Sequence, residues 1–251
     1  MVITTATAQN RRAYQEDRFF TEEINGGLLF GVYDGHGGDW VAEYAVKHTP
    51  YLFKAFLKYT KLRPQTILSR ITDRLDGKTR FCRSGSTAST VWIDKNRKWA
   101  YVSIIGDSPV IILKNDSTIW VSPEHNVRNN PKEAEWIMKM RGGIIHNGYV
   151  FSPRTYQGVG LQMTRALGDY ELDDILNRKP EIFKIPINKN SWILCGSDGV
   201  LNPEHIDISD NVEQMRALIS IPTTKASDLI NYAYQTGSED NITAILVKVS
   251  Q

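Results

Sequence analysis

The segment Leu28–Gly38 reads LLFGVYDGHGG, and it holds both a strong strand signal and the first chemical motif of the chain. Its apolar first half is typical of a buried strand, and Asn25-Gly26-Gly27 just before it is typical of a hairpin turn after Arg18–Glu22. The glycines after Asp34 permit a tight turn, and apolar residues at helical spacing follow in Asp39–Tyr59. The segment therefore predicts a hairpin that delivers Asp34 to the end of a strand, with a helix behind it.

Short apolar runs separated by turn residues continue through the rest of the chain. They predict strands at Thr87–Asp94, Trp99–Ile105, Val110–Leu113, Thr118–Val121, Glu181–Ile187, Ser191–Cys195 and Ile242–Val249. Helical spacing predicts further helices at Pro64–Leu75, Pro131–Met140, Val212–Ile219 and Lys225–Tyr234. Successive hairpins favour antiparallel sheets, and helices in pairs favour two packed sheets covered by helices. We expect an α+β fold and one domain over residues 1–251.

The composition is that of an ordinary globular protein, with 41% hydrophobic and 23% charged residues and a formal charge of +2. Such a charge gives no general reason to expect nucleic-acid binding. No apolar run approaches the length of a membrane span, and Met1–Asn10 lacks the apolar core of a signal peptide. Cys82 and Cys195 have no metal-type spacing, and Cys195 is expected to be a buried thiol. We expect an intracellular protein, cytoplasmic or nuclear or both, without a nucleic-acid or membrane partner.

Positive charge is concentrated in one part of the chain. Between Lys54 and Arg83 there are nine basic residues and two acidic ones, Asp73 and Asp76. This excess could attract an anionic partner or a phosphorylated substrate. The alternative is a solvated helix face, which is the more common use of such a charge pattern.

Four short acidic motifs lie beside apolar runs: Gln15-Glu16-Asp17, Asp34-Gly35-His36-Gly37-Gly38, Gly196-Ser197-Asp198-Gly199 and Glu239-Asp240-Asn241. Each motif by itself is also a common turn. Carboxylates at strand ends from distant parts of a chain can converge, but they cannot all stay ionised unless cations neutralise them. Oxygen ligands without Cys and with little His favour Mg²⁺ or Mn²⁺ over zinc. The four motifs together therefore indicate a metal-dependent hydrolase.

Residues within one of these motifs and just before another suit metal binding and phosphate hydrolysis. Asp34 can bridge two cations, and the carbonyl group of Gly35 can supply another oxygen. His36 beside the metals suits proton transfer to a leaving group. Arg12 lies four residues before Glu16 and offers a planar fork for phosphate oxygens, although an arginine near acids is more often part of a surface ion pair.

Seven motifs in one order carry a family resemblance. They are Arg12-x-x-Gln15-Glu16-Asp17, Val32–Gly38, Ser84–Ala88, Gly106-Asp107-Ser108, Thr164–Asp169, Ser197-Asp198-Gly199 and Asp240-Asn241. Over about residues 10–250 the chain resembles the metal-dependent Ser/Thr phosphatases of the protein phosphatase 2C (PPM) family. The resemblance implies a central sandwich of two antiparallel β-sheets flanked by helices on both faces, with two Mn²⁺ or Mg²⁺ ions at one end. It also implies hydrolysis of phosphoserine and phosphothreonine on proteins by a water molecule that the metal ions activate.

The resemblance implies a set of metal ligands and a set of catalytic residues. The ligands would be Asp34, which bridges the ions, Asp198 and Asp240 on one ion, and Glu16 with the Gly35 carbonyl on the other. Asp107 matches the position that in some members helps to hold a third ion.

The catalytic residues implied by the resemblance are three. Arg12 would hold the substrate phosphate, and His36 would protonate the departing oxygen. Asp17 would orient a water molecule held by the ions. The implied partners are phosphorylated protein substrates, and we expect the protein to act as a monomer.

The chain departs from the family pattern at several positions. Asn202 stands where many members have an aspartate that binds the third ion, and an amide there argues against that site. Pro109 replaces a common arginine, and Glu124-His125-Asn126 replaces a common Asp-His-Lys-Pro stretch. Residues 142–160 resemble the family's variable flap, whose glycines would keep it mobile, although glycines also mark turns. None of these changes removes a principal ligand, so we expect a centre of two ions.

Two other functions remain open at this point. The first is a pseudophosphatase, a binding module that keeps the fold and holds a partner. Loss of a ligand such as Asp34 or Asp198 would favour that alternative, and both residues are present. The second is a phosphatase that acts on small phosphorylated metabolites.

Overall fold

The computed structural model of the chain describes residues 1–154, 158, 160–201 and 209–250. Asn202, the position that argued against a third ion, lies outside the described residues. None of the helices in the described part is long and apolar enough to cross a membrane.

The first sheet is built around the predicted hairpin. Its strand order is β13 (Glu181–Pro186), β7 (Trp99–Ile105), β6 (Ala88–Ile93), β3 (Gly27–Tyr33) and β2 (Arg18–Ile24). All neighbours in this sheet are antiparallel. The turn residues Asn25 and Gly26 have φ angles of 48° and 78°, which a two-residue type I′ hairpin requires and which Asn and Gly tolerate. The predicted hairpin is therefore confirmed.

The second sheet comes from the two ends and the middle of the chain. Its strand order is β1 (Val2–Ala8), β15 (Ile242–Lys248), β14 (Trp192–Gly196), β8 (Val110–Leu113) and β9 (Ile119–Val121). Strand β1 was not predicted, because its threonines and alanines form no strong apolar alternation. Its β-branched threonines nevertheless suit an edge strand, and it pairs with β15 along its whole length.

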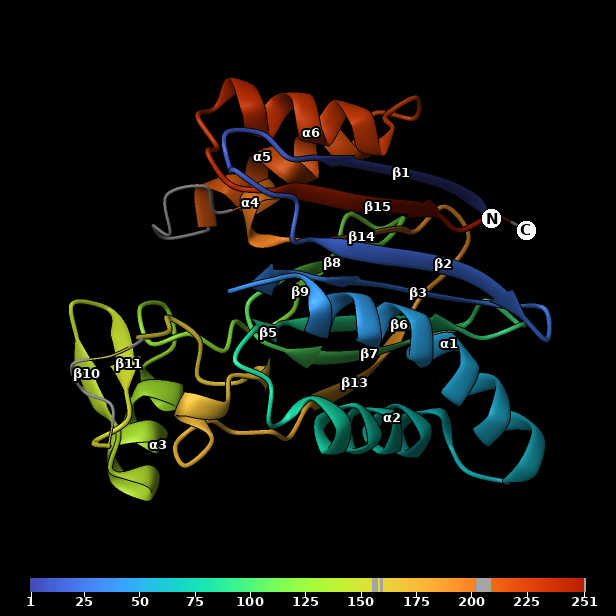
Figure 1. Cartoon of the computed structure of the whole chain (residues 1–251). Coiled ribbons are helices and arrows are strands. Elements are labelled where there is room, and N and C mark those ends of the chain that lie inside the picture. The colour runs from blue at the N-terminus through green and yellow to red at the C-terminus, as the bar shows by residue number, and fades with distance from the viewer. Residues whose placement is uncertain (155–157, 159, 202–208, 251) are drawn as a thin grey trace.

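The two sheets pack face to face, and helices cover both outer faces (Figure 1). Alternate residues of the strands, such as Phe30, Ile193 and Ile245, form the buried core between the sheets. Helices α1 (Trp40–Tyr59) and α2 (Pro64–Thr79) cover the first sheet. Helices α4 (Asp198–Leu201), α5 (Ser209–Ser220) and α6 (Ala226–Gln235) cover the second. The predicted α+β sandwich is confirmed, and Cys195 is buried in its core as expected.

Smaller elements gather at the end of the sandwich where β3 and β14 end. A three-stranded sheet joins β12 (Leu167–Gly168), β5 (Gly85–Ser86) and β4 (Gly35–His36), and a short 3₁₀ helix, η1 (Tyr170–Leu172), follows β12. Helix α3 (Pro131–Arg141) stops at Gly142, whose φ of 66° is the left-handed cap that glycine favours. The hairpin of β10 (Ile144–His146) and β11 (Tyr149–Phe151) comes next and falls within residues 142–160.

Candidate metal and phosphate site

A pocket of about 180 Å³ opens at this end of the sandwich, and residues from both halves of the chain line it. The lining residues are Arg12, Glu16, Asp34, Gly35, His36, Asp107, Tyr149, Gly160, Leu161, Gln162, Met163, Asp198, Asp240 and Asn241. The structure thus brings every predicted metal ligand, together with Arg12 and His36, to one cavity. Asp17 is the exception among the predicted site residues: it does not line the pocket and lies buried close behind it, with an exposed fraction of 3%.

Asp34 is held at the end of β3 by the neighbouring strand. Thr87 Oγ1 accepts a hydrogen bond from the backbone N–H of Asp34 (3.0 Å), and the Thr87 N–H donates to the Asp34 carbonyl oxygen (2.9 Å). Thr87 is in turn hydrogen-bonded to Ser108 (2.6 Å). A side chain at position 35 would lie 2.6 Å from the carbonyl oxygen of Glu16, so Gly35 lets the two acidic loops touch. The backbone on either side of Asp34 is therefore fixed before any ligand binds.

Asp17 is linked to the start of the second acidic segment. Ser197 Oγ donates a hydrogen bond to Asp17 Oδ2 (2.8 Å), and Ser197 Oγ itself accepts one from the Thr243 N–H (2.9 Å). The Ser197 N–H donates to the Thr243 carbonyl oxygen (2.9 Å). This network joins the loop before β2 to β14 and β15, and so it sets Asp198 beside Asp34.

Burial and mutual repulsion disfavour simultaneous ionisation of the carboxyl groups in and behind the pocket. Burial, followed by repulsion from Asp17, Asp198 and Asp240, raises the pKa of Asp34 well above its ordinary value. Burial and the charge of Asp240 raise the pKa of Asp198 to about 7. Burial also raises the pKa of Asp17 to about 7, although its hydrogen bonds from Thr243 and Ser197 oppose the change. Cations bound among these carboxyl groups would relieve the repulsion and favour their ionised forms.

Asp107 belongs to the same acidic cluster. It is buried, and burial followed by repulsion from Asp198 and Glu124 raises its pKa well above the ordinary value. Asn126 lies beside it, with its side-chain nitrogen 3.5 Å from Asp107 Oδ2. Asp107 is therefore placed where it could add a further oxygen to the pocket.

An ion pair with Asp240 positions the side chain of Arg12, and hydrogen bonds from Asn241 hold the loop that carries it. Its Nη2 donates to Asp240 Oδ2 (2.6 Å), while 57% of its side chain stays exposed at the mouth of the site. The side-chain nitrogen of Asn241 donates to the carbonyl oxygens of Gln9 and Tyr14 (2.9 Å each), and its Oδ1 accepts from the Glu16 N–H (2.9 Å). Asn241 thus ties the loop that carries Arg12 and Glu16 to the start of β15.

His36 is oriented by a residue 133 positions away in the chain. Its Nε2 lies 2.8 and 2.9 Å from the two carboxylate oxygens of Asp169, and among the described residues its Nδ1 has no hydrogen-bond partner. Burial by itself would lower the pKa of His36, but Asp169, with Glu16 and Asp198, raises it. A side chain at position 85 would lie 2.1 Å from Asp169 Oδ2 and 2.3 Å from His36 Nε2, so this pair requires Gly85.

The donor set of the pocket fits Mn²⁺ or Mg²⁺. Carboxylates of Glu16, Asp34, Asp198 and Asp240 and the carbonyl group of Gly35 are hard oxygen donors, and no cysteine lines the cavity. The raised pKa values of Asp34 and Asp198 add a second reason for cations to bind here.

Sequence reasoning missed three residues that build the site. Asn241, Asp169 and Thr87 all lie in motifs that pointed to the family, but no role followed from their spacing. A polar residue next to a predicted ligand was the available signal for Asn241. No comparable signal linked Asp169 to His36, because their contact depends on the pairing of β12 and β4 with β5.

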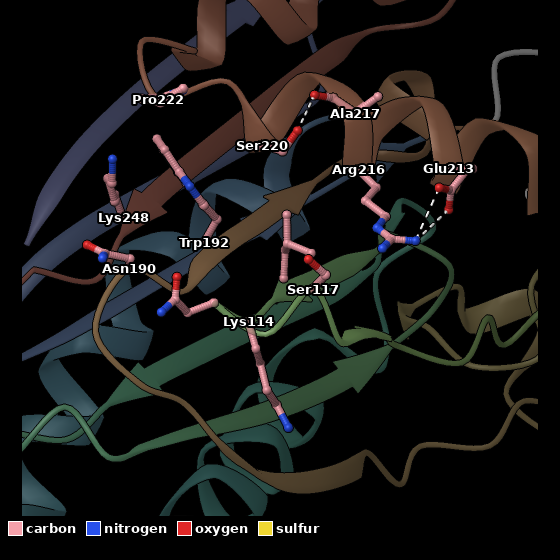
Figure 2. A pocket seen from close by; sticks show the side chains of 12 residues that line it. Lys114, Ser117, Asn190, Trp192, Glu213, Arg216, Ala217, Ser220, Pro222 and Lys248 are labelled. Carbon is pink, nitrogen blue, oxygen red and sulfur yellow. Dashed lines mark hydrogen bonds and ion pairs between the residues drawn. The ribbon is translucent and has the colours of Figure 1, made fainter.

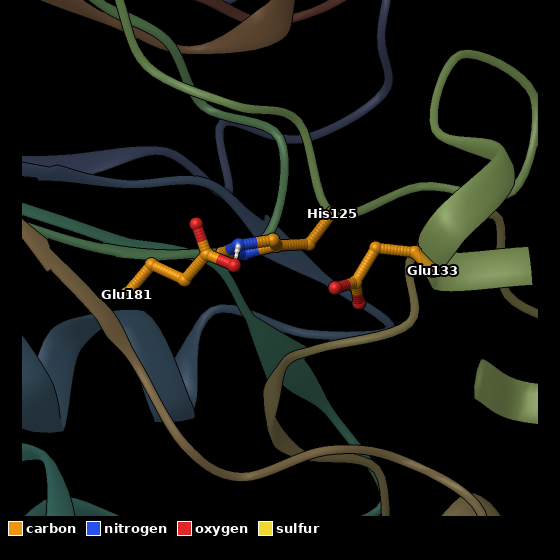
Figure 3. A group of neighbouring side chains, drawn as sticks. All are labelled: His125, Glu133 and Glu181. Carbon is orange, nitrogen blue, oxygen red and sulfur yellow. Dashed lines mark ion pairs between the residues drawn. The ribbon is translucent and has the colours of Figure 1, made fainter. Parts of the chain in front are cut away.

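A second cluster, of His125, Glu133 and Glu181, has ligand atoms within 4.8 Å of one another (Figure 3). Arg165 pairs with both of its carboxylates, because its Nη2 lies 2.5 Å from Glu133 Oε1 and 3.1 Å from Glu181 Oε1. Thr164 Oγ1 also donates to Glu133 (2.5 Å). We interpret the cluster as an ion network that holds α3 against β13.

A larger pocket of about 550 Å³ lies at the opposite end of β14 (Figure 2). Lys248 lies over the ring of Trp192 there (4.7 Å), and Arg216 is paired with Glu213 (3.2 Å). Glu213 is the one carboxylate in the described lining, and it is already neutralised. This pocket therefore offers no acidic site of the kind seen at the other end of the sandwich.

Comparison with known proteins agrees with the fold described above. The family model of protein phosphatase 2C matches residues 7–242. A relative from Oryza sativa subsp. japonica, probable protein phosphatase 2C 45, is 30% identical over 260 residues, which cover 97% of this chain and 86% of the relative. The chain spans about two thirds of the length of several other rice and Arabidopsis relatives, at 63%, 66% and 65%.

Solved structures of low sequence identity share the fold. A sex determining protein of C. elegans has a TM-score of 0.79 at 22% identity, and the match covers 98% of this chain and 64% of that one. The catalytic domain of the serine/threonine protein phosphatase PstP, in complex with two manganese ions, has a TM-score of 0.65 at 18% identity. That match covers 100% of this chain and 98% of the PstP chain.

Proposed function

Because the chain belongs to the protein phosphatase 2C family, we propose that it hydrolyses phosphoserine and phosphothreonine on proteins, with Mn²⁺ or Mg²⁺ as cofactor. The observation that carries the proposal is the convergence of Glu16, Asp34, Asp198 and Asp240 on one small pocket with Arg12 at its mouth. These are the residue types that two divalent cations and a phosphate group require. The chain has kept every one of these positions, which supports an enzyme over a pseudophosphatase.

We propose that Glu16, Asp34, Asp198, Asp240 and the carbonyl group of Gly35 hold two ions. When bound, the ions would supply an activated water molecule and neutralise the charge of the phosphate. Asp107 would add a weak third site at most, since the usual aspartate is replaced at position 202.

The protein's own side chains would then bind the substrate and move a proton. The exposed end of Arg12 can turn from Asp240 to a substrate phosphate, because its guanidinium group presents several N–H donors. His36 would donate a proton to the departing serine or threonine oxygen, and Asp169 favours the charged imidazolium form that carries this proton. Asp17, buried behind the ligands, would orient the attacking water through a hydrogen bond.

We propose that residues 1–251 act as one catalytic domain and that residues 142–160 form a flap over the pocket. Tyr149 and Gly160 from this segment line the cavity, which supports a role in substrate choice. The protein would act as a monomer on phosphorylated proteins. Its two cysteines are unpaired, which fits a reducing compartment inside the cell.

The test is hydrolysis of a phosphothreonine peptide by the purified protein, with Mn²⁺, with Mg²⁺ and with EDTA. We expect turnover that depends on the metal, and much lower kcat/KM for small phosphate esters of metabolites than for the peptide. Turnover of metabolites alone would favour the small-molecule phosphatase. Well-folded protein without turnover at any metal concentration would favour the binding module.

A further inference from the structure

Basic side chains form a stripe along the exposed face of α2. Arg63, Arg70, Arg74 and Lys78 are all exposed, and we call these four residues the α2 stripe. Arg70, Arg74 and Lys78 follow Arg63, the N-cap residue, by seven, eleven and fifteen residues. These intervals bring an α-helix back to nearly the same face, so the four side chains lie on one side of α2. The other side of α2 packs on the first sheet.

The fold does not neutralise the α2 stripe. Among the residues that the structure describes, no carboxylate forms an ion pair with any of its four members. The two acidic residues of α2 form ion pairs with basic residues outside the helix. Asp73 Oδ1 lies 3.1 Å from Lys179 Nζ, and Asp76 Oδ1 lies 3.8 Å from Arg178 Nε. Arg80, just after the helix, does have a partner, Asp173 at 2.9 Å. Ion pairs within the fold therefore do not account for the charges of the α2 stripe among the described residues, and its side chains are free to meet a partner or the solvent.

The C-terminal end of α2 leads toward the candidate site. In Figure 1 the chain leaves this end of the helix and turns to β5, where β3 and β14 also end. Phe81 is 75% exposed and Tyr170 is 52% exposed, and their rings lie 6.1 Å apart. Tyr170 directly follows Asp169, the partner of His36.

The next residues bring this surface to the catalytic loop itself. The side chain of Arg83 is 88% exposed, with Glu171 3.7 Å away as a loose partner. Ser84 packs against the glycine loop that follows His36: side chains at Gly37 and Gly38 would lie 3.7 and 3.5 Å from it. Basic and aromatic residues thus follow one another from α2 to the glycine loop beside His36, which lines the pocket.

We propose that the α2 stripe, with Phe81 and Tyr170 at its end, is a docking surface for an acidic segment of the phosphoprotein substrate. This inference rests on the proposed function and adds a substrate class to it: phosphoproteins that carry Asp, Glu or further phosphates at a distance from the phosphorylated residue. The segment from Arg70 to Lys78 rises about 12 Å, which an extended peptide covers in roughly four residues. Three or four acidic residues in a row would match this length.

A protein segment fits the surface better than a nucleic acid does. The formal charge of the chain is only +2, so the protein as a whole offers little long-range attraction to a polyanion such as RNA. The surface also leads toward the pocket proposed to bind the phosphate group, and its exposed aromatic pair can contact apolar side chains between the acidic residues.

The test compares two phosphothreonine peptides of equal length, one with a run of four Glu residues and one with four Gln residues. Sets with the run on either side of the phosphothreonine, and at several spacings, cover both binding directions. The stripe variant is Arg70→Gln/Arg74→Gln. The matched control is Lys95→Gln/Lys98→Gln, which removes the same charge from an exposed turn between β6 and β7 at the far end of the first sheet.

We expect the wild-type protein to prefer the acidic peptide by about fivefold in kcat/KM at low ionic strength, through KM. The stripe variant should lose this preference and the control should keep it. Hydrolysis of p-nitrophenyl phosphate should be the same in all three proteins. The preference should also disappear near 1 M salt, where the screening length is about 3 Å. No preference in the wild type, or equal loss in both variants, would overturn the proposal.

Direct binding separates this inference from the proposed function. Anisotropy of a labelled acidic peptide without phosphate, measured in EDTA, needs no turnover. Weaker binding to the stripe variant than to the control supports the docking surface even if the protein hydrolyses nothing, and equal binding refutes it. A 20-nucleotide RNA serves as competitor: tighter binding of RNA than of the peptide, lost in the stripe variant, would overturn the proposal in favour of nucleic acid.

Discussion

Replacing Asp198 by asparagine should abolish metal-dependent turnover and yet stabilise the metal-free protein. The substitution keeps the shape of the side chain but removes one charge from the group that Asp34, Asp198 and Asp240 form in the pocket. Burial and the charge of Asp240 now raise the pKa of Asp198 from 3.8 to about 7. Folding therefore transfers the Asp198 carboxylate into an environment that disfavours its negative charge.

The size of the effect follows from this pKa. A rise of roughly three units corresponds to at most ~4 kcal/mol at pH 8, since each unit is worth about 1.4 kcal/mol. Asp198 is half-buried, so water screens part of the repulsion, and the lost hydrogen bonds of the carboxylate cost about 1 kcal/mol. We expect a net gain of about 1–2 kcal/mol in the free energy of unfolding. For a domain of this size that raises Tm by roughly 2–6 °C.

The gain has a defined dependence on pH. An unfolded aspartate loses its proton near pH 4, whereas folded Asp198 keeps its proton up to about pH 7. Between these values the folded state binds more protons than the unfolded state, so the stability of the wild-type protein falls as the pH rises. The part of the effect that comes from relieved charge is therefore largest near pH 8, about half as large near pH 5.5, and absent below about pH 4.

Thermal unfolding in EDTA at pH 5.5 and pH 8 measures this effect. Glu23→Gln, a neutralisation on the exposed face of β2, serves as control and should change Tm by less than about 1 °C. Added Mn²⁺ should raise the Tm of the wild-type protein more than that of Asp198→Asn. A variant that is less stable than wild type at pH 8, or a change of equal size at both pH values, would refute the argument from repulsion.

Two further substitutions test the phosphate and proton-transfer roles. Arg12→Ala should raise KM for a phosphopeptide about tenfold with little change in kcat, because it removes a phosphate contact; steady-state kinetics measures this, and an unchanged KM would remove Arg12 from phosphate binding. Asp169→Asn should lower the pKa of His36, because it removes the charge that now raises it. His36 must be protonated to act as an acid, so the alkaline fall of kcat should move to lower pH in this variant. An unshifted pH profile from an active, folded variant would contradict the link between Asp169 and His36.

Local patterns were enough to predict the strands that carry the metal ligands. The apolar run before Asp34 and the turn at Asn25-Gly26 are local signals, since each depends on residues that are neighbours in the chain. The five longer helices were also predicted within a few residues of their ends, although α2 continues to Thr79, beyond the predicted end at Leu75. The short helix α4, which begins at Asp198, was not predicted. Strand β1 was missed because an edge strand of Thr and Ala has a weak hydrophobic pattern and is stabilised by its pairing with β15.

The sequence by itself determined the chemistry of the site, because carboxylates, a histidine and an arginine in motif order limit which ligands can bind. The tertiary structure decided which groups act together. Asn241 ties down the loop of Arg12, and Asp169 orients His36, through contacts between segments more than 130 residues apart. The tertiary structure also decided that the basic residues of α2 stay unpaired among the described residues, while nearby basic residues such as Arg80 and Lys179 have carboxylate partners. The physical reason is that hydrogen bonds and ion pairs depend on distances of about 3 Å, and chain folding sets those distances, whereas spacing along the sequence does not.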